Sequence, residues 1–274
     1  MAEERLDAIV VGAGPAGVTA ARHLAEAGLA TVVLERGQFP GSKNVWGGIL
    51  YRAPTEEIYP GFESDAPLER PIIEQRYLLL TEDAMLGATY RSERFARPPY
   101  NAYSVMRANF DQWYATTAEA AGAEIYPEFA VTDLIWDDGQ VVGITTGEAE
   151  GELLAKVVVI ADGANSLLAQ KVGLHKEWAP LEQALVAKEV IALPSTTIEE
   201  RFNLPTGLGA ALEIFGESTG GLLGYGFIYT NKESLSIGTG ALLEDLILTG
   251  INVNDMLDRF KRCLLYTSPS PRDS

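Results

Sequence analysis

The chain has 274 residues, 47% of them hydrophobic, and its 38 acidic and 21 basic residues give a formal net charge of −17 at pH 7. This length and composition suit one large or two modest domains with sizeable cores. The acidity argues against a nucleic-acid partner, because no basic face is available to displace counterions from phosphates, and it disfavours docking on anionic lipid by charge alone.

The sequence shows no pattern for membrane insertion or secretion. No stretch of about 18 residues is both apolar and uncharged. The N-terminal segment MAEERLD lacks the apolar core of a signal peptide. A single cysteine excludes an internal disulfide framework. We therefore expect a cytoplasmic protein.

The first informative stretch is Asp7–Glu35, DAIVVGAGPAGVTAARHLAEAGLATVVLE. It has the order strand, glycine turn, helix, strand within about 30 residues, which is the size of a βαβ unit. Ala8–Val11 is a β-branched run typical of a buried parallel strand, and Gly28 is expected to end the helix. The stretch predicts an α/β domain that begins with a dinucleotide-binding crossover.

Three glycines of this stretch, Gly12, Gly14 and Gly17, follow the G-x-G-x-x-G spacing. The first permits a tight turn, the second lets the backbone approach a pyrophosphate, and the third lets the helix pack close to the strand. Glu35 ends the second strand, where a carboxylate can accept hydrogen bonds from both ribose hydroxyls, which favours NAD or FAD over NADP. The alternative is a glycine-rich turn that binds nothing.

The loop that follows, Gln38–Gly48 (QFPGSKNVWGG), is punctuated by proline and glycine. Such a loop can bring backbone N–H groups and the Lys43 ammonium against a phosphate or a flavin ring. The alternative is a plain surface connection.

Residues 50–100 are mixed in character. Glu74–Leu80 and Ala88–Phe95 have strand patterns, with Thr81–Gly87 as the turn, and predict an excursion into a small sheet. This region also contains a basic cluster that can hold an acidic partner or pair with nearby carboxylates: Arg91, Arg94 and Arg97.

A helix is predicted next, with Asn109 as its N-cap. Its apolar face indicates core packing and consists of Phe110, Trp113, Tyr114, Thr117, Ala118 and Ala121. Arg107 precedes the cap, where a cation beside the positive end of a helix is unfavourable without an anion. We therefore expect Arg107 to face a phosphate or a carboxylate.

The next strands are predicted at Ala123–Tyr126 and in a hairpin of Val131–Ile135 with Val141–Thr146. Val157–Ile160 is predicted as a buried strand with Asp162 and Gly163 at its C-terminal end. Ligands of open parallel sheets lie outside such ends, and an aspartate there can bind a ribityl hydroxyl. Leu167–Gly173 is expected to be a short helix.

From Glu182 to Gly240 the pattern changes to alternating strands, which predicts an antiparallel sheet in a second domain. The apolar stretch Gly220–Thr230 indicates sheet core or, as the alternative, the wall of an apolar substrate pocket. Ile251–Lys261 begins a helix. The tail Cys263–Ser274 resembles a translated sequencing adapter, so we expect an artefact there and a truncated protein; the alternative is a disordered tail.

Five segments together resemble the electron-transfer flavoprotein–quinone oxidoreductases, and above all their FixC-type branch. They are GAGPAG, PGSKNVWGG, YSVMRANFDQWYATTAEAAGAE, ADGANS and GFIYTNKESLSIGTG. The resemblance implies a Rossmann-like FAD-binding domain of the glutathione-reductase type, built from residues 1–70 and 100–178. It also implies a mainly antiparallel β-sheet domain for substrate or quinone, from residues 71–99 and 179–262, with residues 263–274 left out.

The resemblance also implies which residues bind FAD. The pyrophosphate would lie on the glycine turn, the adenosine ribose at the acid, and the flavin near the loop and the later Asp-Gly pair. The implied cofactor-binding set is Gly12, Gly14, Ala16, Gly17, Glu35, Arg36, Ser42, Lys43, Gly47, Gly48, Arg107, Asp162 and Gly163. No acid–base catalyst and no metal ligand are implied, and His23 and His175 are expected to be structural or exposed.

The function implied is transfer of electrons from an electron-transfer flavoprotein to a membrane quinone, with FAD as the cofactor. The implied partners are that flavoprotein, a separate ferredoxin-like iron–sulfur subunit and the quinone, in a complex that can be electron-bifurcating. Location would be cytoplasmic, with peripheral attachment to the inner face of the cell membrane as an option. The alternatives are a geranylgeranyl (prenyl) reductase, a flavin-dependent monooxygenase on the same scaffold, or a non-catalytic subunit.

Overall fold

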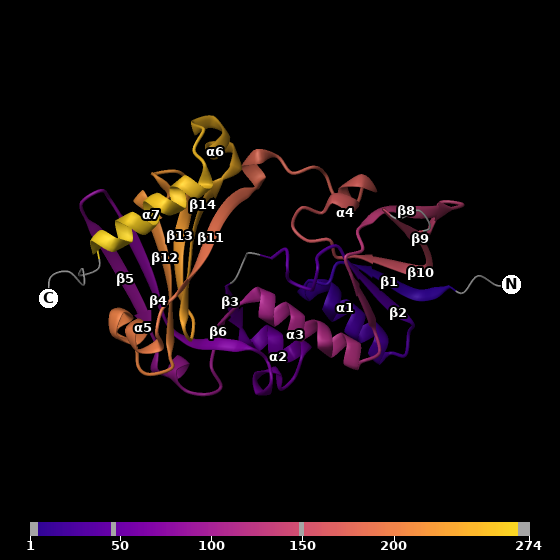
Figure 1. Ribbon diagram of the computed structural model, residues 1–274, viewed down its shortest axis with the longest axis horizontal. Helices are drawn as coiled ribbons and strands as arrows, with labels where there is room; N and C mark the ends of the chain where they lie inside the picture. Colours follow the sequence, from indigo (N-terminus) through magenta and orange to yellow (C-terminus); the bar gives the residue numbers. More distant parts are fainter. Residues whose placement is uncertain (1–4, 45–47, 148–150, 268–274) are drawn as a thin grey trace. The chain divides into compact units, whose positions relative to one another are not determined.

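The computed structural model describes residues 5–44, 48–147 and 151–267, with side chains as far as residue 263. The chain divides into two compact units (Figure 1). The first unit comprises Met1–Val45, Glu63–Pro67 and Arg107–Glu177, and the second comprises Trp46–Phe62, Leu68–Met106 and Trp178–Ser274. The predicted domain ranges instead place all of residues 1–70 with the first domain.

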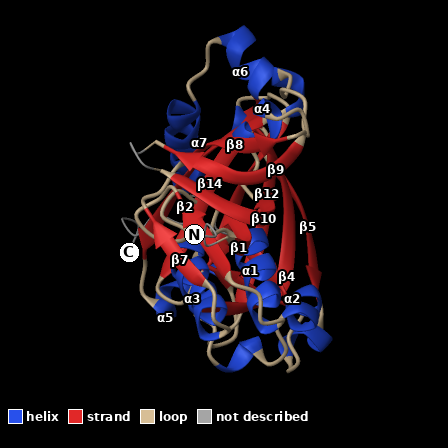
Figure 2. Cartoon of the chain, turned by 90° about the vertical axis from the view of Figure 1, so that its right-hand side faces the viewer, coloured by secondary structure: helices blue, strands red, loops and turns tan. Residues whose placement is uncertain are grey.

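The first unit is built on a six-stranded sheet of order β7-β2-β1-β10-β9-β8, whose strands are labelled in Figure 2. Four neighbouring strands run parallel: β7 (Glu124–Pro127), β2 (Thr31–Glu35), β1 (Leu6–Val11) and β10 (Glu152–Ile160). Two antiparallel strands extend the sheet: β9 (Gln140–Thr146) and β8 (Val131–Asp137). The predicted crossover and the predicted hairpin are both present.

Three helices belong to this unit: α1 (Pro15–Glu26), α3 (Arg107–Ala120) and α4 (Leu167–Lys171). α1 ends before Gly28, which has a φ of +78°, as expected of a residue that follows a helix. The core cluster of the first unit is formed mainly by β-branched and leucine side chains of the sheet, with Leu168 from α4. Its buried members are Ile9, Val11, Val32, Leu34, Leu134, Ile144, Ala155 and Leu168.

Two local predictions for this unit are wrong. Asn109 is not an N-cap, because α3 already begins at Arg107, where an Arg107–Asp111 ion pair spans the first turn. The strand Val157–Ile160 is not fully buried, since Val157 is 54% exposed. β9 pairs only with Glu152–Leu154 of β10, which leaves the following residues with β1 as their one strand neighbour in the described chain.

The second unit contains a larger sheet of order β11-β14-β13-β12-β4-β6-β3, with β5 also paired to β4. All its pairs are antiparallel except β4 with β12. The strands are β3 (Ile49–Tyr51), β4 (Leu68–Leu80), β5 (Met85–Arg91), β6 (Ala102–Val105), β11 (Ala184–Ala192), β12 (Gly209–Gly216), β13 (Gly224–Thr230) and β14 (Ser234–Leu242). The predicted fold class, a parallel Rossmann-like sheet with a second, mainly antiparallel sheet, is confirmed.

Helical segments complete the chain. The α-helices of the second unit are α2 (Arg52–Ile58), α5 (Ser195–Phe202), α6 (Leu243–Thr249) and α7 (Val253–Thr267). Single 3-10 turns are η1 (Phe62–Ser64), η2 (Glu93–Ala96), η3 (Pro180–Glu182) and η4 (Glu217–Thr219). The predicted artefact at residues 263–274 lies mostly outside the described residues, although α7 runs as far as Thr267.

The two faces of the large sheet differ in what covers them. On one face α5 and α7 contribute Ile198, Leu257 and Phe260 to a core cluster with the sheet. On the other face Phe227 and Tyr229 stack with ring centroids 4.8 Å apart and are 2% and 8% exposed. Burial raises the pKa of the Tyr229 phenol above its ordinary value. These two rings of the stretch Gly220–Thr230 therefore belong to the sheet core.

Arg70 on β4 is the largest side chain buried almost completely, at 1% exposed. Its Nε donates to Asn231 O at 2.7 Å, and its Nη1 donates to Glu199 Oε1 at 3.0 Å and Leu208 O at 2.9 Å. Its Nη2 donates to Ser195 Oγ at 2.6 Å and Lys232 O at 3.1 Å. One guanidinium thus joins β4, α5 and the β13–β14 turn.

No helix in the described part of the chain is long and apolar enough to cross a membrane.

Candidate cofactor site

The glycine turn between β1 and α1 is closely packed at two of its three glycines. Gly12 has a φ of +100°, and a Cβ there would lie 2.5 Å from Ala161 O. A Cβ on Gly17 would lie 1.9 Å from Gly12 O, so α1 packs directly on the turn. The first and third glycines are therefore required by the fold.

Gly14 differs from the other two glycines, because the space beside it is open. It precedes α1, and its carbonyl accepts the Val18 N–H at 2.9 Å. A Cβ at Gly14 would meet no protein atom within 4 Å, so the fold itself does not demand glycine there. The N–H groups of Ala16 and Gly17, in the first turn of α1, have no intrahelical acceptor and carry the positive end of the helix dipole. This is a surface to which an anion can come close.

Glu35 at the end of β2 is held by two backbone amides. Its Oε2 accepts the Ala13 N–H at 2.9 Å, and its Oε1 accepts the Gly37 N–H at 2.7 Å. Each carboxylate oxygen can accept a second hydrogen bond, because an ionised carboxylate has about four acceptor positions. Glu35 is thus fixed beside the glycine turn with acceptor capacity left for two neighbouring hydroxyls.

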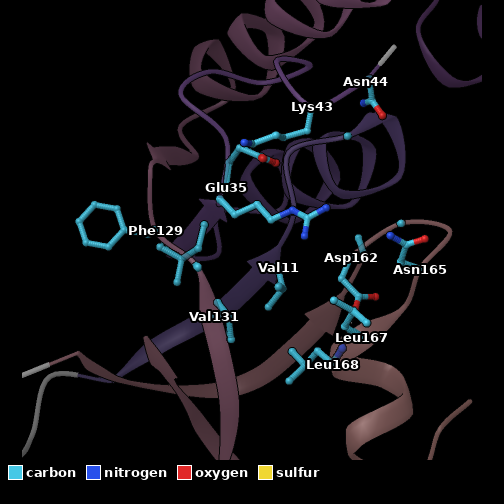
Figure 3. A pocket seen from close by; sticks show the side chains of 17 residues that line it. Val11, Glu35, Lys43, Asn44, Phe129, Val131, Asp162, Asn165, Leu167 and Leu168 are labelled. Atoms are coloured by element: carbon cyan, nitrogen blue, oxygen red, sulfur yellow. Dashed lines mark hydrogen bonds between the residues drawn. The ribbon is translucent and has the colours of Figure 1, made fainter. Parts of the chain in front are cut away.

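A cavity in the first unit collects these groups at the carboxyl ends of β1, β2 and β10 (Figure 3). Seven of the predicted site residues line it: Gly12, Gly14, Glu35, Arg36, Lys43, Asp162 and Gly163. Arg36 and Lys43 are exposed and form no ion pair in the described residues, so both cations remain available to an anion.

One of the two carboxylate oxygens of Asp162 is hydrogen-bonded within the fold. Its Oδ2 accepts the Leu168 N–H of α4 at 2.8 Å, and the next residue, Gly163, has a φ of +84°. The other carboxylate oxygen accepts no hydrogen bond from the described residues, so it can accept one from a hydroxyl. α4 therefore orients the Asp162 carboxylate at the cavity.

Four other predicted site residues of the first unit do not line the cavity: Ala16, Gly17, Ser42 and Arg107. Arg107 Nε and Nη2 donate to Asp111 Oδ1 and Oδ2 at 2.7 and 2.8 Å, so the anion beside this helix start is a carboxylate of the chain itself. Ser42 lies in a turn closed by its N–H to Phe39 O at 3.0 Å. Ala16 and Gly17 belong to α1, Gly48 belongs to the second unit, and Gly47 lies outside the described residues.

The cavity also contains residues that sequence reasoning missed. Among them are six residues labelled in Figure 3: Asn44, Phe129, Val131, Asn165, Leu167 and Leu168. Asn44 Nδ2 donates to Asp111 Oδ2 at 3.0 Å, which ties the loop 38–44 to α3. Asn165 stands within the ADGANS segment and could have been found there. Phe129, between β7 and β8, belongs to no motif.

Comparison with known proteins defines the class. Residues 7–96 and 100–253 match the model of the family described as FAD dependent oxidoreductase. The chain belongs to this family, and its cofactor is FAD. The site fits that cofactor, because an open approach at Gly14, helix amides without an intrahelical acceptor, two exposed cations and a fixed carboxylate suit a diphosphate and a ribose.

Several curated relatives of this chain are FixC proteins. The chain is 46% identical to Protein FixC of Bradyrhizobium diazoefficiens over 263 residues, which cover 96% of this chain and 60% of that protein. It is 47% identical to Protein FixC of Azotobacter vinelandii (94% and 60% covered) and 43% identical to that of Escherichia coli K12 (96% and 61%). The chain thus spans about three fifths of these relatives, and the predicted FixC-type resemblance is confirmed.

Solved structures share the fold. A geranylgeranyl bacteriochlorophyll reductase-like protein of Thermoplasma acidophilum superposes with a TM-score of 0.73 at 22% identity, over 94% of this chain and 61% of that chain. The myxobacterial chondrochloren halogenase CndH gives a TM-score of 0.72 at 22% identity, over 94% and 57%. At this identity the likeness concerns the fold alone.

Proposed function

We propose that this chain is part of an FAD-dependent oxidoreductase that takes electrons from an electron-transfer flavoprotein and passes them to a membrane quinone. The observation that carries the proposal is the 43–47% identity to FixC proteins over nearly the whole chain, together with the cavity at the ends of β1, β2 and β10. The proposed partners are the flavoprotein, a ferredoxin-like iron–sulfur subunit and the quinone. The proposed location is the inner face of the cell membrane, without a spanning helix in the described chain.

In this proposal the chain's residues bind and orient the cofactor. Gly14, with the amides of Ala16 and Gly17, faces the diphosphate, and Arg36 and Lys43 neutralise its charge. Glu35 accepts hydrogen bonds from the adenosine ribose, and Asp162 accepts one from the ribityl chain. When bound, FAD supplies the isoalloxazine ring, which accepts and releases electrons.

Four members of the predicted set have a supporting role. Arg107 holds the buried Asp111, which in turn holds Asn44, so this ion pair anchors the loop that carries Lys43. Gly12 and Gly17 shape the turn, and Ser42 closes the turn before Lys43. Gly47 and Gly48 remain predicted flavin neighbours from sequence alone.

Reconstitution tests the proposal in two stages. The chain is mixed with FAD, freed of unbound flavin by gel filtration, and examined by absorbance near the flavin bands. The complete gene product is then mixed with reduced electron-transfer flavoprotein and a short-chain quinone analogue, and quinol formation is measured. We expect both stages to succeed. Flavin binding without quinol formation would contradict the electron-transfer proposal and leave the cofactor assignment standing.

A further inference from the structure

β5 forms an outer edge of the large sheet in the second unit. It pairs with β4 in the register Leu79 with Leu86 and Tyr77 with Ala88, and no other described strand pairs with it. All seven residues of β5 are exposed. Both Figure 1 and Figure 2 show it beside β4 with no element on its other side.

The hairpin turn determines which backbone groups of β5 are free. The Thr81 N–H donates to Ala84 O at 2.9 Å, which makes this pair a hydrogen-bonded one. Because hydrogen-bonded pairs alternate along an antiparallel ladder, Leu86, Ala88 and Tyr90 direct their N–H and C=O groups toward β4. The intervening residues direct theirs out of the sheet: Met85, Gly87, Thr89 and Arg91.

An unusual amount of apolar surface accompanies this free edge. Leu86 is 72% exposed and Tyr90 54%, and on the same face of β4 Leu79 is 49% and Tyr77 41% exposed. Edge strands are usually protected by lysine, proline or a covering element. β5 has none of these between Met85 and Tyr90, so the edge can pair with another strand.

The charges before and after β5 are mainly of opposite sign, with Glu93 as one acid among the arginines. Glu82 and Asp83 stand in the turn before the strand, and the basic cluster Arg91, Arg94 and Arg97 follows its end. Arg91 forms an ion pair with Glu74, with 3.5 Å between Arg91 Nη1 and Glu74 Oε2. Arg94, Arg97 and Glu82 are exposed and form no ion pair in the part of the chain that the structure describes. A strand with this arrangement complements an antiparallel copy of itself.

We propose that β5 pairs antiparallel with β5 of a second copy of this chain, about a twofold axis at Ala88. This register overlaps all seven residues, with Met85 opposite Arg91 and Gly87 opposite Thr89 as hydrogen-bonded pairs. Leu86 then contacts Tyr90 of the second copy, and Glu82 lies toward Arg94 of the second copy. The dimer does not depend on the proposed electron transfer.

Sedimentation velocity over a concentration series tests the pairing. We expect the chain to dimerise and Thr89→Pro to be monomeric, because the Thr89 N–H points out of the sheet and the hairpin keeps its bonds to β4. The matched control, Thr89→Val, should dimerise like the original chain. Far-UV circular dichroism confirms that each variant is folded. A monomeric original chain, or a dimeric Thr89→Pro variant, would overturn the proposal.

A charge exchange tests the register. Glu82→Lys and Arg94→Glu should each weaken the dimer several-fold, and the two changes together should restore it, because the pair is then reversed rather than removed. Additive weakening in the double variant would contradict this register.

Cross-linking tests the position of the axis. In a Cys263→Ser background, Ala88→Cys should form a disulfide-linked dimer on mild oxidation, because facing residues of a non-hydrogen-bonded pair lie about 4.5 Å apart at Cα. Gln112→Cys, exposed on α3, is the control and should not. A monomer that instead floats with phosphatidylglycerol vesicles would assign this edge to lipid and overturn the proposal.

Discussion

Glu35 in the first unit and Glu199 in the second both accept hydrogen bonds from backbone N–H groups, but the two carboxylates have different roles. Glu35 accepts two N–H groups and lies on a cavity with further acceptor positions. Glu199 Oε1 accepts from Arg70, the Ser195 hydroxyl and the Gly207 N–H, all within the fold. A binding site thus differs from a structural network in the hydrogen-bonding capacity that the fold leaves unused.

The largest expected effect comes from breaking the structural network. Arg70→Met removes every guanidinium bond, leaves Glu199 without its cation and leaves several carbonyls without their donor, so we expect a loss of about 3–5 kcal/mol in the free energy of unfolding. Urea denaturation measures it. Arg201→Met, an exposed arginine on α5, is the control and should change stability by less than about 0.5 kcal/mol. A loss below about 1 kcal/mol for Arg70→Met would contradict the assigned role.

A pair of glycine substitutions separates folding from binding at the turn. In Gly17→Ala the new Cβ would lie 1.9 Å from Gly12 O, so α1 must shift, and we expect a loss of about 1–3 kcal/mol of stability. In Gly14→Ala the Cβ meets no protein atom, so stability should hold while FAD retention falls. Thermal unfolding and flavin titration of both variants check this. Equal loss of stability in both would refute the distinction.

Glu35→Gln tests whether the Glu35 carboxylate binds the ribose of FAD. The amide keeps one acceptor oxygen but loses the charge and one acceptor, which should weaken FAD binding roughly tenfold or more. Flavin fluorescence titration gives the dissociation constant. Glu119→Gln, at an exposed acid on α3, is the matched control and should bind like the original chain. Unchanged affinity in Glu35→Gln would remove the ribose assignment.

The smallest expected effect is a pH dependence in the second unit. The Gly207 N–H, followed by the Arg70 and Ser195 bonds, holds the pKa of Glu199 below its ordinary value. A carboxyl with a lowered folded pKa contributes stability that is present above its unfolded pKa and is lost as pH falls through the folded pKa. Glu199→Gln should therefore flatten the decline in unfolding temperature below about pH 4.5. An unchanged acid profile would argue against this contribution.

Local signals made part of the fold predictable. The crossover Asp7–Glu35 could be read because its glycines, its helix and its two strands lie within one continuous stretch. The β8–β9 hairpin was equally local, and its turn at Asp138 and Gly139, with φ of 44° and 77°, follows the residue preferences of such turns. In both cases neighbouring residues determine the conformation.

Long-range pairing was not predictable in the same way. The parallel pairing of β4 with β12 joins residues more than a hundred positions apart. Nothing in the sequence of either strand identifies the other as its partner. Phe129 reaches the cavity because β8 begins beside it, and Arg70 finds its acceptors on α5 and in the β13–β14 turn. Arg107 was predicted to need an anion, but the partner could not be named, because α3 begins at Arg107 itself and so brings Asp111 one turn along the helix beside it.

The sequence by itself determined the dinucleotide crossover, the acid at the end of β2 and the family, because short-range spacing of glycine and apolar residues encodes them. Only the tertiary structure decided which polar groups keep hydrogen-bonding capacity for a ligand. Glu35 and Lys43 face a cavity, whereas Glu199 and Arg70 satisfy each other. The physical reason is that a polar side chain is satisfied by partners that chain folding brings together, and those partners are distant in sequence.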